Sequence, residues 1–144
     1  MKTIFILDSD PEQRNQMSQH LSAMGFRVRS FTTAAEFEAS GEKPFMVILD
    51  DKMENKDRFS MSFLKKVSRK MSRVPVVYMI TRTDTKLTTD AMKNGAYHVI
   101  EKNSAAFVNL RTTLDKLASV PAKSNWFSRI FSKKQSHDLP ALSI

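Results

Sequence analysis

Apolar and polar positions alternate in blocks along the first 118 residues of the chain. Four short, mostly apolar runs and one run in which charged and apolar residues alternate (27–31) are separated by longer segments whose apolar residues recur at spacings of three and four. Short apolar runs indicate buried strands, and the longer spacing indicates helices with one buried face. The predicted strands are residues 4–7, 27–31, 45–49, 75–80 and 97–100.

The segments between these runs carry helix-boundary residues. Asp10 suits a helix cap before Pro11, and Thr33 stands three residues before Glu36, the spacing of a capping box. The fourth helix is expected to begin at Asp84 or Thr85 and the fifth at Asn103 or Ser104. Five strands alternating with five helices predict an α/β fold with a parallel sheet covered on both faces.

The character of the chain changes after Val120. A linker, residues 121–125, precedes Trp126, Phe127, Ile130 and Phe131, which would share one face of a short basic helix. We therefore predict a domain over residues 1–120 and a linker with an amphipathic tail over 121–144. The tail is expected either to pack onto the domain or to dock on a partner, a second copy or an anionic membrane surface.

Composition narrows the function classes. The absence of cysteine excludes disulfides, thiol nucleophiles and cysteine-ligated zinc. The net charge of +8 is spread along the chain, and charge alone indicates non-specific attraction to nucleic acid, so nucleic acid is not expected to be the main partner. No signal peptide or apolar stretch of membrane-spanning length occurs, which favours a cytoplasmic location.

Chemically active side chains follow four of the predicted strands. Asp8 follows the first strand, Asp50 the third, Thr81 the fourth and Lys102 the fifth. In a parallel sheet these ends open onto one crevice, so two acids, a hydroxyl and an ammonium should converge there. Neighbouring carboxylates need a compensating cation, either Mg²⁺ or the lysine, and such a site suits phosphoryl transfer.

These residues lie in motifs that resemble the receiver domains of two-component response regulators. The resemblance covers about residues 2 to 118, and it rests on FILDSDP at 5–11, VILDDKM at 47–53, MIT at 79–81, NGA at 94–96 and Lys102. It implies a doubly wound, flavodoxin-like sheet in the order 2-1-3-4-5. It also implies a phosphoryl group accepted on Asp50 from a histidine kinase or phosphotransfer protein, with Thr81 and Lys102 contacting that group.

The resemblance further implies a Mg²⁺ site. Its ligands would be Asp8, Asp50 and the backbone carbonyl of Lys52, with Asp10 a weaker candidate because it also suits the helix cap. The family usually has a second acid where this chain has Ser9, and losing a carboxylate should weaken Mg²⁺ binding. The aromatic switch position of the family is Val99, so rotation of an aromatic ring has no counterpart here.

Three functional hypotheses remain at this stage. The first is a single-domain regulator, not an enzyme, that signals through contacts with a downstream protein or a second copy, since the tail is too short to form a DNA-binding output domain. The second is a protein-interaction module of the same fold that works without phosphate. The third and most remote is a haloacid-dehalogenase-type phosphatase, suggested by the spacing of Asp8 and Asp10.

Overall fold

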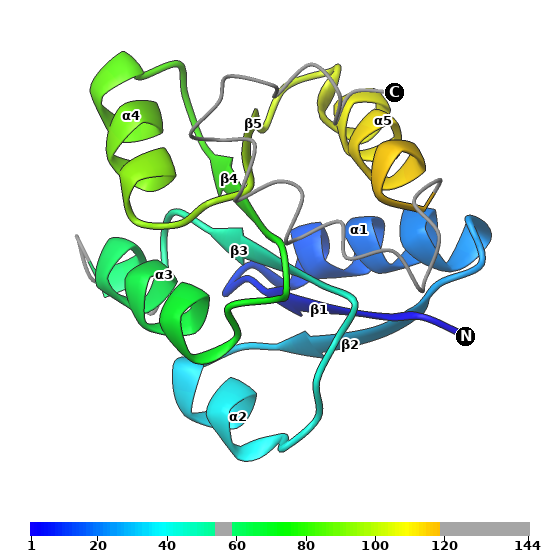
Figure 1. Cartoon of the computed structure of the whole chain (residues 1–144). Coiled ribbons are helices and arrows are strands. Elements are labelled where there is room, and N and C mark those ends of the chain that lie inside the picture. Colours follow the sequence, from blue (N-terminus) through cyan, green and yellow to red (C-terminus); the bar gives the residue numbers. More distant parts are fainter. Residues whose placement is uncertain (54–58, 119–144) are drawn as a thin grey trace. The chain divides into compact units, whose positions relative to one another are not determined.

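The computed structural model describes residues 1–53 and 59–118. The chain divides into two compact units, residues 1–105 and residues 106–144. The first unit contains a five-stranded parallel sheet in the order β2-β1-β3-β4-β5 (Figure 1). Its strands are β1 (Thr3–Leu7), β2 (Arg27–Phe31), β3 (Met46–Asp50), β4 (Val76–Ile80) and β5 (His98–Glu101).

Four helices belong to the same unit, and a fifth opens the second unit. They are α1 (Pro11–Ala23), α2 (Ala34–Ala39), α3 (Phe59–Lys70), α4 (Thr85–Lys93) and α5 (Ala106–Ala118). Asp10 caps α1, Thr33 and Glu36 form the predicted capping box of α2, and Asp84 caps α4. The α/β class, the parallel sheet and its strand order are thus confirmed. Helix α5 begins at Ala106, beyond both predicted caps, while Asn103 accepts a hydrogen bond from the Ala105 amide.

The sheet has a core cluster on the face covered by α2, α3 and α4. Phe5 contacts Phe31 and Phe37 edge to face, and Phe37 contacts Phe63 of α3 in the same way. Side chains alternate along each strand, so Ile4, Ile6 and their neighbours are buried on the opposite face. Strands β3 and β4 are buried at every position, as the continuous apolar runs predicted.

The strand register brings the carboxyl ends together at one edge of the sheet. Leu7 pairs with Leu49, Asp50 with Met79, and Ile80 with Glu101. Backbone pairing continues one residue further, because the Asp51 amide donates to Met79 and the Lys102 amide donates to Ile80. The residues that follow the strands are therefore held by backbone hydrogen bonds and not by loop conformation alone.

The predicted linker and tail, residues 121–144, lie outside the described residues, so the domain boundary at 120 remains a prediction. Within residues 1–53 and 59–118, no helix is both long enough and apolar enough to cross a membrane.

Two glycines end helices in the same way but in different surroundings. Gly25 follows α1 with a φ of +94°, and Gly95 follows α4 with a φ of +108°. A β-carbon at Gly25 would meet nothing within 4 Å, whereas one at Gly95 would lie 2.5 Å from Cβ of Ser68 on α3. Only Gly95 therefore combines a left-handed backbone with a close helix contact.

We expect Gly25→Ala to lower the free energy of unfolding by about 1 kcal/mol, the cost of a positive φ alone. Gly95→Ala should cost about 2 kcal/mol more, because α3 must also move away. Urea unfolding measures both, and Ser68→Gly should recover part of the extra loss in the Gly95→Ala chain. Equal losses for the two alanine variants would contradict the close contact.

Candidate functional site

Two buried carboxylates and one ammonium meet at the carboxyl edge of the sheet. Nζ of Lys102 contacts Oδ1 of Asp50 directly and lies 3.8 Å from Oδ2 of Asp8. The side chains of Asp50, Asp8 and Lys102 are only 5%, 8% and 14% exposed, so water screens their charges weakly. The structure thus brings together three of the four residues predicted to converge.

Burial controls the electrostatics of this cluster. It raises the pKa of Asp50 from 3.8 to about 6, although the hydrogen bond and positive charge of Lys102 favour the ionised form. The negative charge of Asp8 adds to the rise in the Asp50 pKa. Burial also raises the pKa of Asp8, against the hydrogen bond donated by the Asp10 amide. Lys102 is therefore the counterion that favours the ionised form of two neighbouring acids, against the effect of their burial.

The backbone beneath both acids is fixed by side chains from nearby helices. The hydroxyl of Ser60, in the first turn of α3, donates to the backbone carbonyl of Asp50 and is fully buried. Burial raises the pKa of Tyr78 on β4 to about 12, so its phenol stays neutral. Arg14 of α1 donates to the backbone carbonyl of Asp8 at 2.8 Å. The sequence pattern does not predict these supports, because Ser60 and Arg14 follow loops whose course it does not define.

Thr81, which is expected to contact a phosphoryl group on Asp50, is hydrogen-bonded to the neighbouring acid, Asp51. Its hydroxyl donates to Oδ1 of Asp51 at 3.0 Å, and its backbone amide donates to Oδ2 of Asp51 at 3.1 Å. Its hydroxyl proton is therefore used by Asp51 and not by Asp50. Asp51 is a site residue that the sequence motifs alone do not single out, although the strand pattern carries a signal for it. Successive side chains of a strand point in opposite directions, so the second acid of the pair should face a different neighbour.

The predicted metal ligands are only partly brought together. Asp8 and Asp50 share one site, but Asp10 is exposed and its carboxylate accepts from the Glu12 amide as the cap of α1. No group of three acidic, histidine or cysteine side chains suited to a metal occurs within residues 1–53 and 59–118. Mg²⁺ is often held by one or two carboxylates, with water completing its coordination shell. Asp8 and Asp50 therefore provide the kind of oxygen donor that Mg²⁺ needs, but their two carboxylates supply little negative charge.

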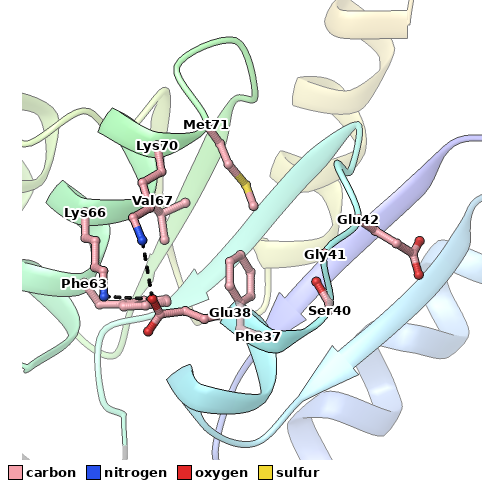
Figure 2. Close-up of a pocket in the computed structure, with 10 residues that line it drawn as sticks. All are labelled: Phe37, Glu38, Ser40, Gly41, Glu42, Phe63, Lys66, Val67, Lys70 and Met71. Carbon is pink, nitrogen blue, oxygen red and sulfur yellow. Dashed lines mark ion pairs between the residues drawn. The ribbon is translucent and has the colours of Figure 1, made fainter.

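A separate hollow of about 230 Å³ lies between α2, the following loop and α3 (Figure 2). Phe37, Phe63, Val67 and Met71 form its apolar wall. The charged groups at its rim are already paired, since Glu38 binds Lys66 at 2.7 Å and Glu42 binds Arg29. Nothing at this hollow selects a ligand, so the strand-end cluster is the better candidate for function.

Comparisons with known proteins found a matching family model and matching relatives. The family model described as the response regulator receiver domain matches residues 4–115. The regulatory protein DctD of Rhizobium meliloti is 30% identical over 72% of this chain and 23% of its own length. The regulatory protein FixJ of Bradyrhizobium diazoefficiens is 30% identical over 69% of this chain and 48% of its own length. This chain thus spans less than half of these relatives.

Solved structures agree with the fold. The receiver domain of DrrB, activated with BeF3, superposes with a TM-score of 0.74 over 83% of this chain and 99% of that one, at 18% identity. A response regulator receiver protein from Pseudoalteromonas atlantica gives a TM-score of 0.72 over 81% and 96% of the two chains, at 19% identity. At these identities the likeness concerns the fold alone.

The raised pKa of Asp50 makes stability depend on pH. Folding favours the protonated form, so the contribution of Asp50 is complete below its ordinary pKa of 3.8 and is lost as the pH rises through about 6. We expect Asp50 to add about 1 kcal/mol to the free energy of unfolding between about pH 7.5 and pH 5 without divalent cations. Urea unfolding of the wild-type and Asp50→Asn chains at both values isolates this difference. The same pH response in both chains would show that Asp50 is not the group responsible.

Proposed function

This chain belongs to the response regulator receiver family, and from that premise we propose that it accepts a phosphoryl group on Asp50 and signals through protein contacts. Receiver domains are signalling modules that interact with histidine kinases or phosphotransfer proteins. The observation that carries the proposal is the direct contact of the buried Asp50 carboxylate with the Lys102 ammonium. A carboxylate held against a fixed cation at the open edge of a sheet is suited to take up a dianionic group.

The proposed step is a transfer from a phosphohistidine of the partner. An Asp50 oxygen attacks phosphorus, the new P–O bond forms as the P–N bond breaks, and the leaving imidazole nitrogen takes a proton from water. Lys102 would then donate to a phosphoryl oxygen, offsetting charge that increases around Asp50 during transfer. Because Asp8 is also negative, Lys102 and a bound cation would have to balance two acids and the phosphoryl group together.

Receiver domains generally bind Mg²⁺ at the acidic phosphorylation pocket. In this chain Asp8 and Asp50 would hold the ion, with the backbone carbonyl of Lys52 as a further oxygen donor and Asp10 retained in the cap of α1. When bound, Mg²⁺ offsets the negative charge on the phosphoryl oxygens. Ser9 supplies no carboxylate, and this supports a weaker metal site than two adjacent acids would form.

The downstream contact is proposed to be with another protein or a second copy of this chain. The relatives DctD and FixJ are named transcriptional regulatory proteins, and this chain covers less than half of either. Position 99 of β5 holds a valine, which is partly buried against the core cluster. Rotation of an aromatic ring at Val99 therefore cannot report the state of Asp50. The β4–α4 loop, whose Thr81 borders the site, is the better route for a change of shape.

The competing hypothesis is a module of the same fold that binds its partner without phosphate. Ser9 and the engagement of the Thr81 hydroxyl by Asp51 favour it, because both depart from a pocket arranged for a phosphoryl group. The phosphatase hypothesis has no comparable support, because the carboxylate of Asp10 caps α1.

We expect the purified chain to gain one phosphoryl group when incubated with phosphoramidate and Mg²⁺. Intact-mass spectrometry detects the added mass, and the Asp50→Asn chain should show none. Asp115, an acid of α5 that belongs to none of the site motifs, provides the matched control, since Asp115→Asn should be modified normally. Wild-type protein that is folded yet takes up no phosphoryl group from either phosphoramidate or a histidine kinase would reject the proposal in favour of the phosphate-independent module.

Restoring a second acid after β1 should strengthen metal binding. We expect Ser9→Asp to lower the Kd for Mg²⁺ by about tenfold, because a third carboxylate joins a site formed by two. Isothermal titration calorimetry measures the change, with Ser9→Asn as a control of similar size that adds no charge. If Ser9→Asp and Ser9→Asn bind Mg²⁺ alike, the missing carboxylate does not limit the site.

A further inference from the structure

The acid that follows Asp50 binds the only hydroxyl expected to serve the phosphoryl group. Both oxygens of Asp51 are engaged, one by the Thr81 hydroxyl and the other by the Thr81 amide. A hydroxyl has a single proton to donate. While Thr81 donates to Asp51, it cannot donate to a group on Asp50.

The β4–α4 loop is held at a second point by a similar bond. Thr83 donates its hydroxyl to Glu101, the last residue of β5, and Asp84 then caps α4. Thr81 and Thr83 are both exposed threonines that donate to a carboxylate at a strand end. Only Thr81, however, binds an acid adjacent to Asp50, so the two bonds form a matched pair with different expected consequences.

We propose that Asp51 is a positioning residue that holds Thr81 away from Asp50 in the unphosphorylated chain and thereby slows phosphoryl transfer. This inference rests on the proposed function of Asp50. Asp51 touches neither donor nor product in this scheme and acts mainly through Thr81, with a smaller effect of its negative charge. Transfer to Asp50 then requires the Thr81 hydroxyl to exchange the Asp51 carboxylate for a phosphoryl oxygen.

Asp51 and a phosphoryl group on Asp50 compete for the Thr81 hydroxyl, and the competition is balanced closely enough to regulate phosphoryl transfer. Thr81 is exposed and Asp51 is half-buried, so water can replace the bond at modest cost. A phosphoryl group brings nearly two negative charges and three strong acceptor oxygens, which makes it the stronger partner for the Thr81 proton. The Thr81 amide retains the Asp51 carboxylate as a partner when only the hydroxyl turns, so the loop need not detach entirely.

The test compares phosphorylation rates with phosphoramidate in a double-mutant cycle. In this reaction the P–O bond to Asp50 forms, the P–N bond breaks and ammonia leaves. We expect Asp51→Ala to raise the rate about tenfold, because Thr81 is released and a repelling charge is removed. In the Thr81→Ala background, the same change should raise the rate only about twofold, because the effect of charge alone remains.

Two further variants serve as controls. Thr83→Ala removes the matching bond to Glu101 and should leave the rate within about twofold of wild type. Thr81→Ser keeps the hydroxyl and should retain the large response to Asp51→Ala. An equal gain from Asp51→Ala with and without the Thr81 hydroxyl would overturn the proposal, as would a lower rate in the Asp51→Ala chain.

A measurement without any phosphodonor separates this inference from the proposed function. Hydrogen exchange of the Thr81 amide, followed by NMR, should be about tenfold slower in wild type than in Asp51→Ala. If the Thr81 amide exchanges equally fast in the two chains, Asp51 does not hold Thr81, whatever the transfer rates are. A protected Thr81 amide in a chain that never accepts a phosphoryl group would instead reject the function of Asp50 and reduce Asp51 to an anchor of the loop.

Discussion

The arrangement of the site depends on one ammonium shared by two buried carboxylates. Without Lys102, Asp8 and Asp50 would face each other with little water to screen them, and at least one would take up a proton. Lys102 can fill this position because its amide extends the pairing of β5 with β4 beyond the strand. The parallel sheet thus does more than support the site, since its register determines which charges meet.

Much of this was predictable from the order of residues. Apolar runs predicted most of the strands, and the strands β1, β3 and β5 are followed or ended by Asp8, Asp50 and Lys102, so the convergence of these side chains followed from the shared edge of a parallel sheet. Helix starts were predictable where a cap has a local signature, as at Asp10 and Thr33. The start of α5 was predicted less well, because Asn103 instead caps a turn that precedes the helix.

Other contacts required the three-dimensional structure. The order of residues places Thr81 at the same edge as Asp50 but does not say which of two adjacent acids its hydroxyl will choose. Likewise, Ser60 reaches the backbone carbonyl of Asp50 across ten residues of sequence. Such choices depend on distances of a few ångströms, which the period of two in a strand does not determine.

The adjacent acids at the end of β3, Asp50 and Asp51, are linked to the β4–α4 loop by two different routes. Asp50 binds Lys102 after β5, and the neighbouring Glu101 binds Thr83 in the β4–α4 loop. Asp51 binds Thr81 at the start of that loop. A charge added at Asp50 would therefore act on this loop from both directions, through the position of Lys102 and through competition for Thr81. Because α4 begins immediately afterwards at the Asp84 cap, a movement of the loop would reach the surface of α4. This route would not need an aromatic ring on β5, where the chain has Val99.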